Sequence, residues 1–311
     1  MRIGTSLARG YKAIMLEHSA AHMTGRMWNA FNNTQRLYLA LVSGGCVALF
    51  LLLSKLMGWP VYLKCEASLL TSASPVTGIA VVVVGLFLSI LAATLLLGHL
   101  RYEAGLFAAC IGLAALASRG GTVGSLLRSS GRPQVYFAML METGMLLGMM
   151  GLAWTQLSLL RRSGWLAPEP CDPEKEVAAS FATRLMATVS QAVVTGMLIF
   201  ILARVDHQKQ IMAAVVIASI IGSIAAHQAF PLRPSAPFWI GPFVVAMAGY
   251  AWAMKSPGAW EIGTPANALA AASPLHYASL GTAGGIFGYW VSRQWREAER
   301  EMELPADALD G

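Results

Sequence analysis

The sequence predicts an all-α integral membrane protein, a polytopic transmembrane helical bundle of about eight spans. Of its 311 residues, 56% are hydrophobic and only 12% are charged, whereas a soluble domain has roughly 45–50% and about 25%. The apolar residues also gather into blocks of about twenty, the length of a helix that crosses a hydrocarbon core of about 30 Å. The shortage of charge excludes a water-soluble surface.

Eight apolar blocks divide the chain. We expect a cytoplasmic, interfacial amphipathic helix over 1–36, a transmembrane bundle over 37–291 and a charged cytoplasmic tail over 292–311. The third block is the shortest, so a re-entrant segment at 103–118 with seven full spans is the alternative. The blocks occupy residues 37–59, 77–98, 103–118, 136–160, 186–204, 211–229, 237–254 and 275–291.

The basic residues favour eight spans over seven. With both termini inside, eight spans put 14 of the 22 Lys and Arg residues on the inner side and 8 on the outer side, whereas seven spans divide them 12 to 10. Because inner loops collect Lys and Arg, we expect a multi-pass protein of a cell inner membrane, or of an organellar inner membrane, with cytoplasmic termini. The net charge of +6 is then explained by basic residues that set the orientation of the protein in the membrane. No nucleic-acid partner is expected.

Tryptophans at block ends predict interfacial anchors, since an indole ring suits the headgroup layer. These residues are Trp59, Trp239, Trp252 and Trp290.

The loop before the fifth block predicts an unusually long helix. Asp172 suits an N-cap and Pro173 suits the first helical position. Without a breaker before Arg204, the helix would run about 45 Å and begin in the cytoplasm.

Glu142 is the clearest ionisable residue inside a block, and a charge near mid-membrane costs several kcal/mol. Two roles stay open: a proton or cation site, or a structural carboxyl group that is protonated or paired with Arg119 or Arg204. The opposite helix face carries Gly144 and Gly148, a seam that lets another helix approach closely. We therefore expect Glu142 to face protein or an aqueous cavity instead of lipid.

Three further polar residues lie at similar predicted depth near the inner side. Gln156, Gln191 and His227 come from the fourth, fifth and sixth blocks. They predict the lining of an inward-facing cavity. The alternative is a set of interhelical hydrogen bonds in a static bundle, worth about 0.6 kcal/mol each. With Glu142 they form the candidate ligand or ion site.

The last block carries two interleaved small-xxx-small pairs, formed by Gly281, Gly284, Gly285 and Gly288. This pattern is typical of helix packing. A second role expected for such Gly-rich helix faces is contact with a second copy of the chain or with another chain.

The turn before the third block holds His99, Arg101 and Glu103. We expect these polar groups to reach water at the end of a helix hairpin. A lipid-headgroup role is the alternative.

The sequence lacks HExxH, a Walker loop, CxxCH and a nucleophile elbow. No catalytic residue, metal site or cofactor is therefore expected. The leading hypothesis is a small solute or ion carrier or permeation protein in the lipid bilayer, with a buried carboxyl site. A non-catalytic structural or assembly subunit of a membrane complex is the alternative, and an intramembrane lipid-modifying enzyme is the weakest of the three.

Overall fold

The computed structural model describes residues 33–55, 68–72, 74–98, 100–101, 103–129, 132–162, 164, 180–233, 235–256 and 264–303. All regular structure within these ranges is helical. The long helices are α2 (Asn33–Ser54), α3 (Pro75–Leu97), α6 (Arg132–Arg162), α7 (Phe181–Leu202), α8 (Gln208–Ala229), α9 (Ala236–Lys255) and α11 (Thr282–Glu303). The shorter ones are α4 (Ala104–Ala117), α5 (Val123–Ser129), η4 (Ala268–Ala271), α10 (Pro274–His276) and the π-helical η5 (Tyr277–Gly281).

Six of the described helices, α2, α3, α6, α7, α8 and α9, are long and apolar enough to cross a membrane. Large apolar side chains cover the outside of the bundle, among them Leu95 and Leu152, which are 69% and 67% exposed. Water would oppose such a surface, whereas lipid accepts it. The predicted all-helical fold is confirmed, and the apolar helices indicate a membrane protein. The helix α4, with 14 residues, and α11, with its charged second half, fall outside the six.

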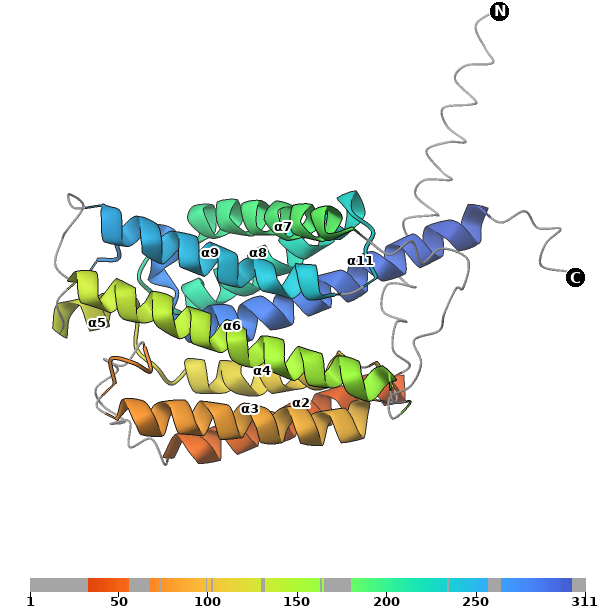
Figure 1. Ribbon diagram of the computed structural model, residues 1–311, viewed down its shortest axis with the longest axis horizontal. Helices are drawn as coiled ribbons and strands as arrows, with labels where there is room; N and C mark the ends of the chain where they lie inside the picture. Colours follow the sequence, from red (N-terminus) through yellow and green to blue (C-terminus); the bar gives the residue numbers. More distant parts are fainter. Residues whose placement is uncertain are drawn as a thin grey trace, which may run out of the picture.

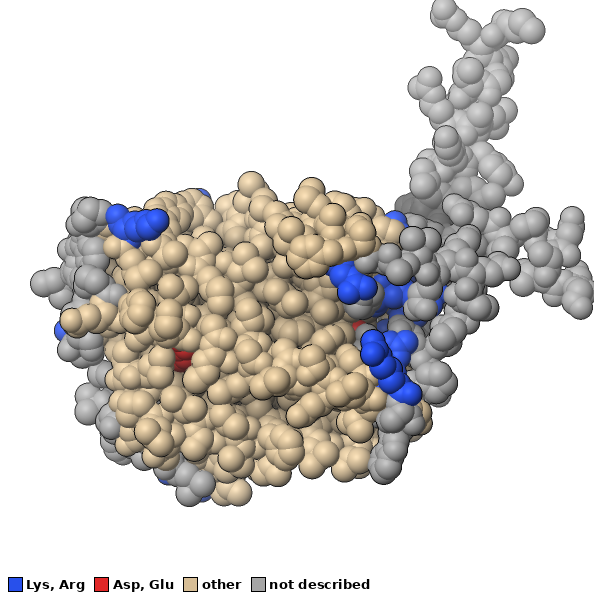
Figure 2. Space-filling view, in the orientation of Figure 1, with Lys and Arg blue, Asp and Glu red and all other residues tan. Residues whose placement is uncertain are grey.

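The helices form two groups with α6 between them (Figure 1). Helices α2, α3 and α4 pack together in one group, and α7, α8, α9 and α11 pack together in the other. Counting α4, the successive helices α2, α3, α4, α6, α7, α8, α9 and α11 run in alternating directions, so α2 begins at the end of the bundle where α6 and α11 finish. We call this the basic end, because α6 finishes there with Arg161 and Arg162. On the face seen in Figure 2, Lys and Arg gather toward the two ends and leave the middle bare.

Glycines bring helices into backbone contact in both groups. A Cβ added at Gly112 of α4 would lie 2.8 Å from the carbonyl oxygen of Cys46 on α2, and one added at Gly284 of α11 would lie 2.9 Å from that of Val216 on α8. Gly288 likewise faces the carbonyl oxygen of Ile220. The glycine seam of the last block is therefore covered inside the chain.

The glycine seam predicted on α6 is not packed closely against another described helix. Nothing lies within 4 Å of a Cβ added at Gly148, and one added at Gly144 would meet only the end of Met247, at 3.9 Å. These two glycines therefore make no close helix contact with the described residues. The expected close approach is wrong within this chain, because α9 meets α6 through long side chains there.

The predicted tryptophan anchors fall into three groups. Trp239 and Trp290 are buried, so the interfacial role is wrong for both. Trp239 packs on Trp154, with ring centroids 5.8 Å apart. Trp252 is 51% exposed, as an interfacial ring would be. Trp59 lies outside the described residues.

Two predicted element boundaries also need correction. Ser180, with a non-helical ψ of 154°, caps α7 by accepting a hydrogen bond from the backbone N–H of Thr183. The predicted start at Pro173 lies outside the described residues, but a continuous helix into α7 is wrong, because Ser180 is non-helical and its hydroxyl provides a later N-cap. At the other end of the chain, α11 continues past residue 291 to Glu303. The predicted helix over 1–36 lies almost wholly outside the described residues.

Candidate functional site

Among the described buried side chains of the helix group formed by α7, α8, α9 and α11 (the second helix group), the amide of Gln191, near the middle of α7, has the most polar atoms without a hydrogen-bond partner. It is fully buried, and neither its amide oxygen nor its amide nitrogen has a hydrogen-bond partner among the described residues. An amide in this situation costs roughly 1–3 kcal/mol. Buried polar groups are nearly always hydrogen-bonded, so each exception calls for an explanation.

Helix α9 makes room for this amide at Gly241. A Cβ added at Gly241 would overlap the amide oxygen of Gln191, so the amide occupies space that only a glycine leaves free. The next residue, Pro242, has no N–H and lies inside the helix. The carbonyl of Phe238, four residues earlier, therefore loses its helical donor. The hydrogen-bond ladder of α9 is therefore interrupted one residue after Gly241, and the freed carbonyl oxygen of Phe238 faces Gly285 of α11, where an added Cβ would clash with it.

Helices α8 and α11 complete the surroundings. A Cβ added at Gly281 would lie 2.7 Å from the Cβ of Pro242 and 3.7 Å from Oγ of Ser219. The hydroxyls of Ser219 and Thr282 are both buried, without a hydrogen-bond partner among the described residues. The π-helical turn η5 ends at Gly281, and such turns are frequent at functional sites. We call Gln191, Ser219, Gly241 and Pro242 the Gln191 core.

The chemistry of the Gln191 core is polar and uncharged. The amide of Gln191 can donate and accept, and the hydroxyl of Ser219 can do the same. Such a set suits a neutral solute that forms hydrogen bonds, or a cation that has exchanged water for protein oxygens. Helix α7 is held against α8 beside it, since Thr195 donates to the carbonyl oxygen of Ala218 at 3.4 Å, where Gly222 leaves space for the threonine.

Residues 264–273 pack against the helices at the end of the bundle opposite the basic end. Three buried tyrosines from α6, α9 and η5 bind this segment through their hydroxyls. The bonds are Ala266 N–H to the Tyr136 hydroxyl at 2.9 Å, Tyr250 hydroxyl to the Ala272 carbonyl at 2.6 Å, and Tyr277 hydroxyl to the Leu269 carbonyl at 2.8 Å. The segment is therefore part of the packed core at this end.

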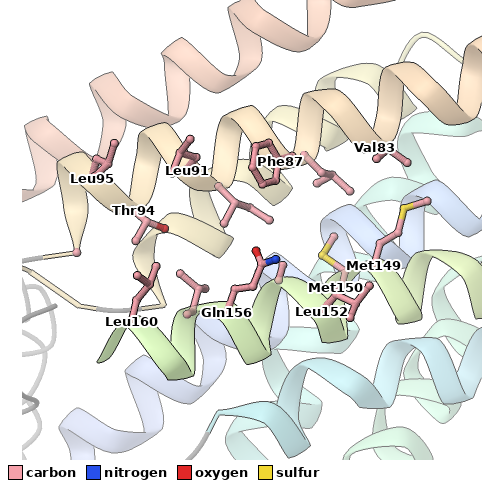
Figure 3. A pocket seen from close by; sticks show the side chains of 15 residues that line it. Val83, Phe87, Leu91, Thr94, Leu95, Met149, Met150, Leu152, Gln156 and Leu160 are labelled. Carbon is pink, nitrogen blue, oxygen red and sulfur yellow. The ribbon is translucent and has the colours of Figure 1, made fainter. Parts of the chain in front are cut away.

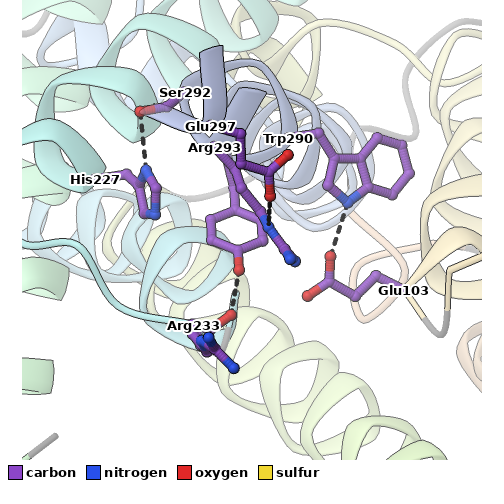
Figure 4. A network of polar contacts seen from close by, with 8 residues as sticks. Glu103, His227, Arg233, Trp290, Ser292, Arg293 and Glu297 are labelled. Atoms are coloured by element: carbon purple, nitrogen blue, oxygen red, sulfur yellow. Dashed lines mark hydrogen bonds and ion pairs between the residues drawn. The ribbon is translucent and has the colours of Figure 1, made fainter. Parts of the chain in front are cut away.

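At the basic end, Glu103, directly before α4, is bonded to α11 (Figure 4). Trp290 donates its indole N–H to Glu103 at 2.8 Å, and the guanidinium of Arg101 lies 5.7 Å from the centroid of the Trp290 ring. Glu103 is buried, so the expectation that it reaches water is wrong: Trp290 supplies the donor instead. Burial and nearby Arg293 lower the pKa of Arg101 below its usual range. His99 lies outside the described residues.

Glu142 is fully buried and binds one short segment of the chain. Its Oε2 accepts hydrogen bonds from the Ser68 hydroxyl at 2.6 Å, the Leu69 N–H at 2.8 Å and the Leu70 N–H at 3.4 Å. The carboxyl group thus faces protein and fixes the segment before α3. Neither Arg119 nor Arg204 is its partner among these bonds, and Arg204 donates instead to the carbonyl oxygen of Ile201 at 3.1 Å.

The other predicted site residues do not meet at one cavity. Gln156 is exposed between α3 and α6, away from the second helix group. His227 lies on α8, where its Nδ1 is 2.9 Å from the hydroxyl of Ser292 on α11. Gln191 contacts α9 instead of either residue. The predicted inward-facing cavity lined by all three is therefore wrong. The prediction grouped the three residues by their similar depth, but they lie on different sides of the bundle.

Of the Gln191 core, only Gln191 was among the candidate site residues predicted from the sequence. Pro242 carried a usable signal, since a proline inside the apolar block 237–254 frees a backbone carbonyl.

No family model matches the chain, and neither a curated protein nor a solved structure matches it significantly.

Proposed function

We propose that the protein is a small membrane carrier or permeation protein, and that the Gln191 core binds the transported solute or ion. The observation that carries this proposal is the fully buried amide of Gln191, which has no hydrogen-bond partner among the described residues. It contacts α9 at Gly241, one residue before the proline that interrupts the hydrogen-bond ladder of this helix. In many transporters, broken helices near the bilayer midplane supply freed backbone groups to substrates and ions.

The proposal includes a membrane arrangement of eight spans, with α4 as the third and α10 to α11 as the eighth. The alternating helix directions and the arginines of the basic end support it. Because basic residues collect on the cytoplasmic side, the basic end is cytoplasmic, in a cell inner membrane or an organellar inner membrane.

Contacts that join chain segments at both ends are compatible with a carrier that opens to one side at a time. Tyr250 bonds the carbonyl of Ala272 at one end, and Trp290 bonds Glu103 at the other. Under this proposal Glu142 stabilises the bundle and does not bind the transported species. Its contacts with Ser68 and Leu69 support that role.

The rival proposal is a structural or assembly subunit. The glycines of α11 are covered by α8 and α9, so a partner chain would have to use another face. On α6, Gly144 and Gly148 are not tightly covered by the described residues. The face of α6 that carries them is therefore favoured as the contact surface of a homo- or hetero-oligomer.

Ligand-dependent unfolding separates the two proposals. The purified protein is heated with alkali cations and with small neutral solutes, as the wild type and as Gln191→Leu. A carrier is stabilised by one of these classes, by about 2.7 kcal/mol at 100 times its Kd. Gln191→Leu should lose that response yet be at least as stable without ligand, because it removes an unpaired amide.

The matched control is Gln134→Leu, which changes the same residue type at an exposed position of α6. It should respond to ligand as the wild type does. A wild type that no member of the panel stabilises, or a response that Gln191→Leu retains, would favour the structural subunit.

A further inference from the structure

A groove of about 450 Å³ runs between α3 and α6 on the outside of the bundle. Figure 3 shows Phe87 and Leu91 on one wall and Met149 and Leu152 on the other. Phe87 is 56% exposed, so the groove opens onto the apolar surface that the bilayer covers. Its walls therefore suit a hydrocarbon chain.

One polar side chain interrupts these apolar walls. The amide of Gln156 points into the space between α3 and α6 (Figure 3), and Thr94 lines the same groove. Gln156 forms no hydrogen bond with the described residues. An amide without a partner is costly in hydrocarbon. A ligand with an acceptor group at this depth would satisfy it.

The groove ends at the basic end of the bundle. Leu160 and Gly98 line its last part, and Arg161 and Arg162 follow directly and finish α6. Arg162 is exposed there. Neither arginine lines the groove, but an apolar groove that ends one residue before two arginines of the same helix complements a molecule with a hydrocarbon chain and an anionic head.

The difference in depth between Gln156 and Arg162 along α6 suits a glycerophospholipid. Six residues separate Gln156 from Arg162, which is about 9 Å at helical rise. The headgroup layer of a bilayer is about 5–8 Å thick on each side of the hydrocarbon core. A phosphate at Arg162 therefore places glycerol ester carbonyls near the depth of the Gln156 amide.

We propose that this groove is a specific site for one anionic glycerophospholipid. An acyl chain lies between Phe87 and Leu152, an ester carbonyl accepts a hydrogen bond from Gln156, and the phosphate pairs with the arginines that end α6. This site depends on the bilayer location of the protein and not on transport through the Gln191 core. The two are on different helix groups, so each can fail without the other.

Native mass spectrometry with defined lipids tests the site. The detergent-purified protein is titrated with phosphatidylglycerol or with phosphatidylcholine of identical acyl chains. The wild type should retain one phosphatidylglycerol with a preference of about tenfold, equivalent to about 1.4 kcal/mol. The double variant Arg161→Gln/Arg162→Gln should lose the preference. Arg204→Gln, at the opposite end, should keep it.

Gln156→Leu separates the ester contact from the charge contact. It should weaken both lipids about fivefold, as expected for one lost hydrogen bond, and leave the preference between them intact. Thr155→Val is its control, since Thr155 is exposed on the same helix but does not line the groove. Equal retention of the two lipids by the wild type, or a preference that survives the double arginine variant, would overturn the proposal.

Discussion

Gln191 on α7 and Gly241 on α9 are in direct contact, with the glutamine amide in the space that a side chain at position 241 would need. Gly241→Ala should therefore push the amide out of the Gln191 core. We expect loss of any ligand-induced rise in unfolding temperature, and a loss of about 1–3 kcal/mol in stability from overpacking. Thermal unfolding with and without ligand measures both.

Gly196→Ala is the matched control for this change. A Cβ at Gly196, also on α7, would lie 3.7 Å from the side chain of Val245, an ordinary contact. It should leave the ligand response intact. If both variants responded to ligand alike, the position of the Gln191 amide would have no part in binding.

Glu142 is predicted to stabilise the segment before α3. Glu142→Ala removes the acceptor for the Ser68 hydroxyl and the Leu69 N–H, at about 1–3 kcal/mol for each donor left unsatisfied. Glu142→Gln retains an oxygen acceptor and should keep most of the stability. Hydrogen exchange at Leu69 should accelerate strongly in the first variant and little in the second.

Transport measured in the Glu142→Gln variant adds an independent check. A structural carboxyl group leaves the pH dependence of any activity unchanged. If that dependence disappeared while exchange at Leu69 stayed slow, Glu142 would be a coupling site after all.

Gly284→Ala tests the packing of the second helix group. The added methyl would lie 2.9 Å from the carbonyl oxygen of Val216, a backbone atom that can move only with α8. We expect a loss of about 1–3 kcal/mol in thermal stability. Gly148→Ala has open space and should be neutral or slightly stabilising, since Ala favours helix by up to about 1 kcal/mol. Equal effects of the two would contradict the contact between α8 and α11.

Composition and block length were enough to predict a helical membrane protein, because both follow from the solvent that surrounds the helices. Burial of Glu142 was also predictable, since hydrocarbon does not accept an unpaired carboxyl group. Its partners were not, because Ser68 is distant in sequence and a loop has no periodicity. Position along each helix similarly predicted that Gln156 and Gln191 lie at one depth in the membrane. It could not predict which neighbouring helix each side chain would face.

Sidedness can be checked by cysteine labelling on a cysteine-free background. Ala182→Cys, in the first turn of α7, and Lys255→Cys, at the end of α9, are exposed at opposite ends of the bundle. An impermeant thiol reagent should modify position 255 from outside and position 182 only after permeabilisation. Labelling at 182 from outside would invert the arrangement.

The most direct test of the carrier proposal is the accessibility of Ser219 inside a sealed membrane. Ser219 is fully buried, but a carrier exposes its binding site as it opens, on a microsecond to second timescale. Ser219→Cys on a cysteine-free background, in sealed vesicles, should react with a small impermeant thiol reagent from at least one side. Ligand should change that rate. Ala214→Cys, buried on the same helix in an apolar cluster, is the control and should stay unreactive. If Ser219→Cys is as unreactive as Ala214→Cys from both sides, with and without every ligand tested, the Gln191 core does not open and the carrier proposal is wrong.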